Sequence, residues 1–89
     1  MASREIIEDQ LFTHQIARLR VNWKRLDEAM MTMYPALQNS PELFPRVPGT
    51  KLHRMKLVGF QGVPPLSIFF TISPTQIVIK AAELIDLEE

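Results

Sequence analysis

One short segment concentrates side chains that could do chemistry, and it alternates as a β-strand does. The cationic or titratable ones are Lys51, His53, Arg54 and Lys56. Alternation places Arg54 and Lys56 on one face of the strand. The other face carries Lys51, His53, Met55 and Leu57. Because Met55 and Leu57 suit a face covered by helices, we expect Arg54 and Lys56 to point from an uncovered face.

Residues from two later segments are expected to join this uncovered face. They are Ser67, Phe69, Thr71 and Lys80. A large aromatic ring beside three cations is suited to stacking a base and holding phosphates. The residues predicted to contact RNA are Lys51, Phe69 and Lys80. The alternative is a solvated sheet face with one scattered aromatic, which is normal on soluble proteins.

Other kinds of chemistry have no signature in the chain. The three glycines are too few and wrongly spaced for a phosphate-cradling loop, and His14 and His53 lie far apart without ligand spacing. For His53 we weigh an ordinary strand residue against a general acid or base. Ser67 and Ser73 are more naturally strand residues than nucleophiles. We therefore predict no metal site and no cofactor.

Length and composition set the remaining limits. The chain has 89 residues, which is enough for a single domain over 1–89. Ten basic and ten acidic residues cancel, so nucleic-acid binding would need a local patch. The chain has no cysteine, no apolar run that could span a bilayer and no signal-peptide layout at its start. We expect a cytoplasmic protein without a membrane partner.

An apolar stripe at helical spacing must position the candidate residues. Its members are Ile16, Leu19, Trp23, Leu26, Met30, Met33 and Leu37, at alternating intervals of 3 and 4. This spacing predicts helix from about 10 to 34, with the stripe buried. The helix is either one rod or a hairpin broken near Val21 and Asn22, and Pro35 is expected to kink it or to open a last turn.

The rest of the chain is predicted to be a connector followed by strands. Three prolines and a glycine mark 39–50 as an ordered connector, which Leu43, Phe44 and Val47 would hold to the core. Strands are expected over 51–60, 66–73 and 77–84. In the last strand, Ile77, Ile79 and Ala81 should share one face. Residues 4–8 fit either a strand or a first helical turn.

These elements together predict an α+β fold. A helical hairpin, or a kinked long helix, would pack on one face of a three- to four-stranded antiparallel sheet.

Three stretches of the chain resemble the RelE/ParE toxin superfamily of bacterial toxin–antitoxin modules. They are Trp23–Ala29 in the helix, Ser40–Thr50 in the connector and Pro64–Ile72 in the central strand. The likeness covers roughly residues 10–85. It implies the same α+β fold, with residues 4–8 as an extra edge strand. It also implies an antitoxin that wraps the chain and blocks the cleft of its sheet.

The resemblance implies one of two activities, because family members are ribosome-dependent endoribonucleases or gyrase poisons. For the nuclease, Arg54, Lys56 and His53 are the candidate catalytic residues: the cations would stabilise the phosphorane and His53, turned inward, would take the proton. Two departures leave this set incomplete. Ser67 stands where the family often has an arginine, and the C-terminus offers no arginine, histidine or tyrosine.

Three hypotheses follow from the sequence. The first is a toxin-family protein that binds an antitoxin and acts as a ribosome-dependent mRNA endonuclease with a degenerate site. The second is a non-enzymatic toxin directed at gyrase through its helical face, and the third is a non-toxic, degenerate family member that only assembles. The oligomeric state stays open, a homodimer included.

Overall fold

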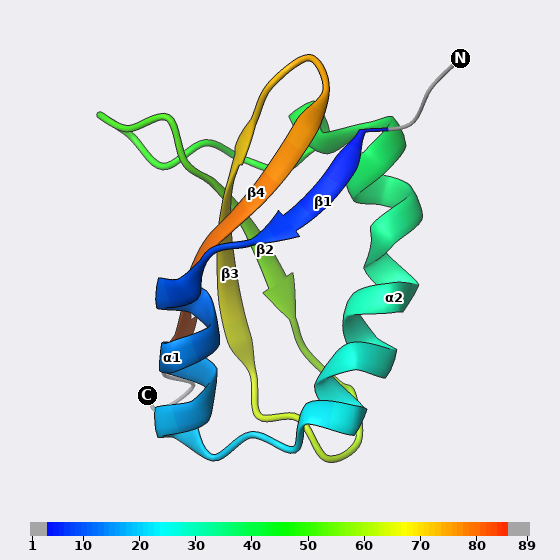
Figure 1. Cartoon of the computed structure of the whole chain (residues 1–89), viewed down its shortest axis with the longest axis vertical. Helices are drawn as coiled ribbons and strands as arrows, with labels where there is room; N and C mark the ends of the chain where they lie inside the picture. Colours follow the sequence, from blue (N-terminus) through cyan, green and yellow to red (C-terminus); the bar gives the residue numbers. More distant parts are fainter. Residues whose placement is uncertain (1–3, 86–89) are drawn as a thin grey trace.

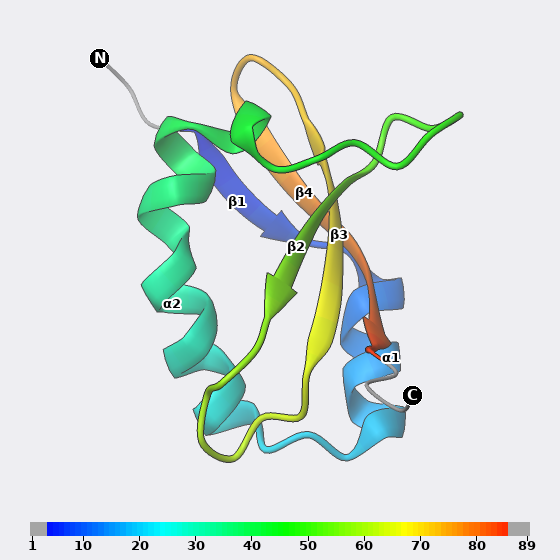
Figure 2. The ribbon, with the colours of Figure 1, turned by 180° about the vertical axis from the view of Figure 1, so that it is seen from behind.

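A four-stranded mixed sheet and two helices make up the α+β architecture of this chain (Figures 1 and 2). The computed structural model describes residues 4–85. The elements are β1 (Glu5–Glu8), α1 (Gln10–Leu19), α2 (Trp23–Asn39), a short 3-10 turn η1 (Pro41–Leu43), β2 (His53–Leu57), β3 (Leu66–Ile72) and β4 (Gln76–Leu84). The strands lie in the order β1-β4-β3-β2.

The apolar stripe belongs to two helices, so the alternative with a break near Val21 and Asn22 is the correct one. Arg20 ends α1 in the left-handed conformation, with φ at 57°, and its N–H bonds to the carbonyl of Ala17 at 3.2 Å. Asn22 then caps α2, because its side-chain oxygen accepts a hydrogen bond from the backbone N–H of Arg25 at 3.1 Å. The prediction that Trp23 is buried is wrong: it is the first residue of α2 and is 39% exposed.

Pro35 neither ends the second helix nor opens a new one, since α2 continues to Asn39. The predicted end at 34 is therefore too early. Proline removes the hydrogen bond that would reach the carbonyl of Met31. Both Pro35 and Met31 are exposed, so water can replace the missing donor.

The first strand overturns the prediction of a purely antiparallel sheet. Residues 5–8 form a strand that pairs in parallel with β4, with Glu5 opposite Gln76 and Glu8 opposite Ile79. Asp9 follows at once and caps α1. Gln15 of α1 accepts a hydrogen bond from the backbone N–H of Ala82 at 2.7 Å. Because α1 must lie beside the last residues of β4, β1 has to run in the same direction as β4.

The other three strands form the expected antiparallel meander, with a bulge in the last one. Phe69 pairs with Ala81 whereas Phe70 pairs with Ile79, so Lys80 is an extra residue. The bulge reverses the alternation that follows it. Ala82, and not Ala81 as predicted, therefore joins Ile79 in the core. The first predicted strand, 51–60, is shorter than expected because turns replace both of its ends.

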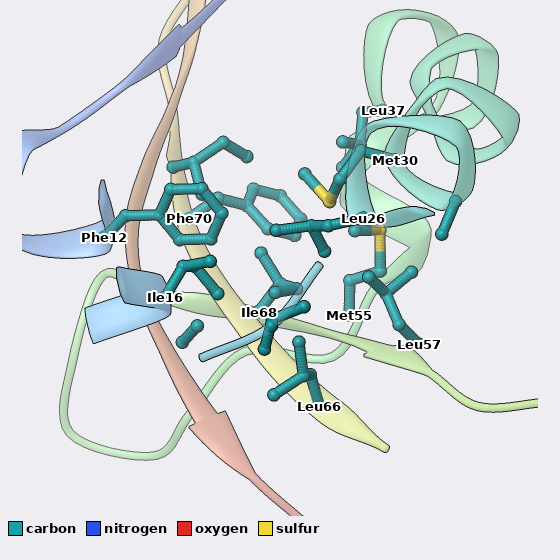
Figure 3. Close-up of a cluster of buried hydrophobic side chains, with 14 of the residues drawn as sticks. Phe12, Ile16, Leu26, Met30, Leu37, Met55, Leu57, Leu66, Ile68 and Phe70 are labelled. Carbon is teal, nitrogen blue, oxygen red and sulfur yellow. The ribbon is translucent and has the colours of Figure 1, made fainter. Parts of the chain in front are cut away.

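The core fills the space between the helices and one face of the sheet (Figure 3). Its largest fully buried members are Phe12, Phe70, Ile16, Leu26, Met30, Leu37, Met55, Leu57, Leu66, Ile68, Ile77 and Ile79. In the connector, Phe44 packs edge-on against Phe70, with ring centroids 5.7 Å apart. The same role predicted for Leu43 is wrong, since Leu43 is 83% exposed at the end of η1. Val47 is half-buried outside the core cluster.

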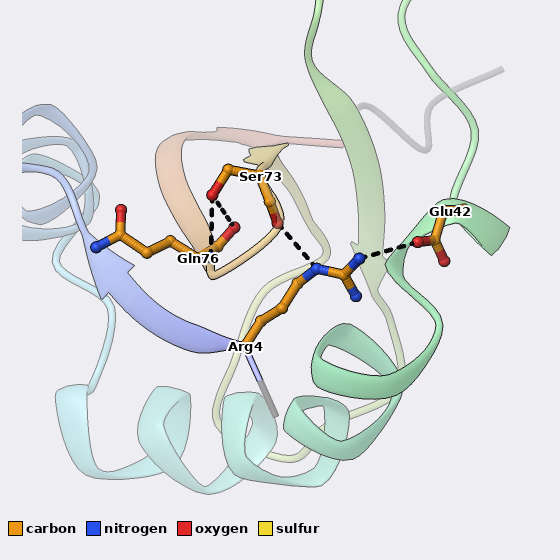
Figure 4. Close-up of polar contacts among 4 residues, drawn as sticks. All are labelled: Arg4, Glu42, Ser73 and Gln76. Atoms are coloured by element: carbon orange, nitrogen blue, oxygen red, sulfur yellow. Dashed lines mark hydrogen bonds and ion pairs between the residues drawn. The ribbon is translucent and has the colours of Figure 1, made fainter. Parts of the chain in front are cut away.

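A polar cluster around Arg4 ties the start of β1 to two other elements (Figure 4). The Nε of Arg4 donates to the carbonyl of Ser73 at 2.9 Å, and its Nη2 lies 3.3 Å from a carboxylate oxygen of Glu42. Ser73 itself bonds through its hydroxyl to the backbone of Gln76, which closes the turn between β3 and β4. Both sides of the Arg4 guanidinium thus serve the fold.

Within residues 4–85, the structure contains no helix both long enough and apolar enough to cross a membrane.

Candidate functional site

A groove of about 350 Å³ opens where the connector meets the sheet face that the helices leave uncovered. Its lining comes from the connector and from one residue on each antiparallel strand: Pro45, Arg46, Val47, Pro48, Arg54, Phe69 and Glu83. The groove therefore combines two arginines, one aromatic ring and one carboxylate.

The connector forms one wall of the groove because backbone hydrogen bonds hold it to the edge of β2. The N–H of Arg54 donates to the carbonyl of Pro45 at 2.9 Å, and the N–H of Val47 donates to the carbonyl of Leu52 at 2.8 Å. Arg46 pairs with His53 as an isolated antiparallel bridge. The tip of this connector then projects beyond the sheet as a hairpin (Figure 2).

Strand register decides which side chains form the floor of the groove. In one row across the sheet, Arg54 stands opposite Phe69, and Phe69 stands opposite Ala81. In the next row on the same face, Lys56 faces Ser67 and Ser67 faces Glu83. Phe69 is half-buried, and Ala81, its partner on β4, has only a methyl side chain.

Arg54 is held in place by Ser67. The Nε of Arg54 donates to the Ser67 hydroxyl oxygen at 2.8 Å, and Ser67 is only 1% exposed. A guanidinium carries five N–H donors, four of them on its two Nη atoms. Within residues 4–85 no acceptor lies in hydrogen-bond or ion-pair range of those Nη atoms. The free end of Arg54 can therefore bind a phosphate or carboxylate with two parallel hydrogen bonds.

Of the predicted site residues, Arg54, Lys56 and Phe69 come together on this face. Met55 and Leu57 are buried on the other side, so the predicted alternation of β2 is confirmed. Lys56 is exposed and lies one row from Arg54, beside the groove lining.

His53 does not join them. Its Nδ1 lies 2.8 Å from the carbonyl of Phe44, an arrangement that makes Nδ1 the donor and fixes the ring. The imidazole also stacks on Phe70, with centroids 5.7 Å apart and an interplanar angle of 23°. Since Phe70 belongs to the core, the histidine lies on the face opposite Arg54.

The two other predicted RNA contacts also lie apart from the groove lining. Lys51 is an exposed residue of the connector's last turn. Lys80, the bulge residue, lies 3.3 Å from a carboxylate oxygen of Asp9. The pKa of Asp9 is lowered, first by the hydrogen bond from the backbone N–H of Leu11 and then by Lys80. Lys80 thus supports the junction between β1 and α1.

Arg46 and Glu83 are groove residues that the sequence reasoning missed. Arg46 lies between two prolines, and only the bridge to His53 brings it to the sheet. Glu83 reaches the uncovered face because of the bulge at Lys80, which strict alternation along the strand does not include. If Lys80 is counted as an extra residue of the last strand, alternation places Glu83 on the uncovered face.

A second groove, of about 490 Å³, lies between α1 and the end of β4. Its lining residues are Gln15, Arg18, Leu19, Ala82, Glu83 and Leu84. It has one cation and no aromatic ring, so it lacks the combination that binds a nucleotide. Over residues 4–85 no cluster of three histidine, aspartate or glutamate side chains is placed to hold a metal ion.

Comparison with profiles of known protein families finds none that matches this chain, and no curated protein sequence matches it.

Proposed function

We propose that this chain is a RelE/ParE-like toxin component whose groove binds single-stranded RNA until an antitoxin covers it. The observation that carries the proposal is the Nη end of Arg54, which has no bonded acceptor among residues 4–85 and which Ser67 holds beside Phe69 and Arg46. Two helices on a sheet with β1 as an extra edge strand support the family resemblance, which implies an antiparallel sheet, whereas β1 is parallel to β4. The proposed location is the cytoplasm, where mRNA and ribosomes are available.

The chemistry of the groove favours RNA over a neutral ligand. Arginine binds phosphate oxygens in a bidentate manner, and Arg46 and Arg54 approach the groove from two different elements. A single-stranded base can stack on an aromatic side chain, for which the half-buried Phe69 is available. The exposed Lys56 extends the positive charge along the sheet, so the strand would continue across that row.

The arrangement favours binding over cleavage. Proton removal from a ribose hydroxyl requires a base within hydrogen-bond reach of it. His53, the candidate for that role, is bonded to Phe44 on the opposite face of the sheet. Arg54 and Lys56 supply positive charge, and charge alone leaves the proton transfer unassisted.

The direct test is the affinity for a fluorescently labelled eight-nucleotide RNA, followed by anisotropy at several salt concentrations. Arg54→Ala with Lys56→Ala should weaken binding about thirtyfold, more than Arg54→Ala alone. It should also reduce the slope of log K against log salt by about 1.4, since each phosphate contact contributes about 0.7. The matched control is Arg18→Ala with Lys24→Ala, which removes the same charge from the helices. Equal losses in the two double variants would contradict the proposal.

Expression of the chain in a bacterial host tests the toxin role. Growth arrest with loss of translation, relieved by the Arg54→Ala and Lys56→Ala pair, is expected. Arrest with intact RNA that persists in that variant would instead favour the gyrase-directed alternative. Normal growth with folded protein would favour the third hypothesis, a non-toxic family member that only assembles.

A further inference from the structure

Glu83 is the residue of the groove that phosphate binding does not explain. Glu83 lines the same groove as Arg46 and Arg54, and it also lines the second groove beside α1. Within residues 4–85, no cation lies within ion-pair distance of the Glu83 carboxylate. Arg54 stands in the neighbouring row of the sheet, opposite Phe69. An unneutralised carboxylate repels a phosphodiester chain, so its place in an RNA groove calls for a different ligand group.

The position of Glu83 relative to Phe69 suggests which group that is. Phe69 stands opposite Ala81, and Glu83 follows two residues later on the same face. Such diagonal neighbours lie about 7–8 Å apart, within reach of long side chains. A base stacked on Phe69, in the space that Ala81 leaves, would therefore direct its edge toward the Glu83 carboxylate.

We propose that the groove selects guanine, with Phe69 stacking on the base and Glu83 accepting hydrogen bonds from its N1–H and N2–H. This inference rests on the proposed function. An ionised carboxylate is an acceptor only, with two oxygens side by side. Guanine offers two adjacent donors on its Watson–Crick edge. Cytosine and adenine place an unprotonated ring nitrogen next to their amino group, and uracil places a carbonyl on each side of its single N–H.

The test uses seven-nucleotide RNAs that are uridine throughout except for the central base. The wild-type chain should bind the guanosine oligomer about tenfold more tightly than all-uridine RNA, as a good bidentate contact allows. Adenosine and cytidine should resemble uridine. Inosine, which lacks the N2 amino group, should fall between guanosine and uridine.

Glu83→Gln separates base selection from charge. The variant should lose most of the guanosine preference and bind all-uridine RNA more tightly than wild type, because a repulsive charge is gone. Glu5→Gln, an exposed change on β1, is the matched control and should alter neither. Free guanosine monophosphate should compete only weakly, since it lacks the neighbouring phosphates. Competition at the oligomer's own concentration would overturn the assignment of RNA as the source of the base.

The outcomes distinguish the two proposals. Equal binding of all four oligomers would overturn guanine selection and leave RNA binding in place. A guanosine preference that survives in Glu83→Gln would overturn the role of Glu83. No binding of any oligomer by the folded wild-type chain would overturn both.

Discussion

Arg4 and Arg54 begin with the same contact and end with different roles. Each donates from Nε to an oxygen of a serine on β3 or just after it, at 2.9 Å to the Ser73 carbonyl and 2.8 Å to the Ser67 hydroxyl. The Arg4 guanidinium also pairs through Nη2 with Glu42, so two of its three nitrogens serve the fold. The Arg54 guanidinium is held by one edge only. A count of cations cannot separate these two residues, whereas the guanidinium nitrogens that are bonded within residues 4–85 can.

The same contrast divides Phe69 and Phe70, which are adjacent in the chain. Phe70 is fully buried, touching Phe44 and His53, whereas Phe69 is half-buried in the groove lining. Truncation of a buried phenylalanine costs about 3–5 kcal/mol. We therefore expect Phe70→Ala to lower the free energy of unfolding by about that amount and Phe69→Ala by about 1 kcal/mol or less.

Urea unfolding followed by circular dichroism measures both losses. RNA affinity should show the reverse order, with Phe69→Ala weakening it about tenfold, as loss of a stacked base does. Similar losses of stability in both variants would mean that Phe69 is a core residue and the uncovered face is not a binding surface.

The two arginines provide a second, smaller contrast. Arg54→Ala should weaken RNA binding about tenfold. It should lower stability by about 1 kcal/mol, because the hydrogen bond to the buried Ser67 hydroxyl is lost. Arg4→Ala should leave RNA affinity unchanged and lower stability by about 1–2 kcal/mol, since it loses a partly buried hydrogen bond to a carbonyl. A stability loss for Arg54→Ala that exceeds that of Arg4→Ala would reverse the comparison.

Ser67→Ala sharpens the account of how Arg54 is positioned. Without the hydroxyl, the guanidinium has more freedom and must lose it again on binding RNA. We expect affinity to fall about threefold, less than in Arg54→Ala, which corresponds to about 0.7 kcal/mol. The check is the Nε–H resonance of Arg54, whose proton should exchange faster with water once the hydrogen bond to Ser67 is lost. An unchanged resonance would show that Ser67 does not hold the side chain.

Glu8 offers the smallest effect and a pH dependence with a defined sign. Its pKa is raised above 4.5, mainly because of burial and secondarily because of Asp27. A carboxyl whose pKa is raised by folding stabilises the protein below its unfolded value and loses that contribution as the pH rises through the raised value. Glu8→Gln should therefore increase the free energy of unfolding at pH 7 and have no such effect at pH 3. The pKa of Tyr34 is raised by burial and by the charges of Glu8 and Asp27, so a titration of Tyr34 reports the loss of the Glu8 charge in Glu8→Gln.

The elements of this fold follow from periodicity, but their junctions do not. The stripe from Ile16 to Leu37 keeps its spacing across the break at Arg20, because the two helices happen to present their apolar sides to one core. The left-handed residue at the end of α1 is Arg20 and not a glycine, so Asn22 is the only cap signal that the sequence gives for this break. The direction of β1 depends on where α1 packs, which is a tertiary contact between Gln15 and Ala82.

The candidate site shows the same limit. Alternation correctly places Arg54 and Lys56 on the other face of the strand from Met55, because this placement depends on one strand alone. Arg46 and Glu83 depend on relations between elements, a bridge in one case and a bulge in the other. Lys80 is predicted as an RNA contact because alternation puts this cation on the uncovered face. Its pairing with Asp9 depends on the position of β1, which alternation does not give.

The most direct test of the central claim is a titration of the isotopically labelled chain with the short RNA, followed by nuclear magnetic resonance. Binding in the groove predicts shifts at the Arg54 Nε–H and at the backbone amides of Phe69 and Glu83, with the Arg4 Nε–H unchanged. Shifts confined to the helices, or shared equally by Arg4 and Arg54, would contradict the claim that the groove is the RNA-binding site.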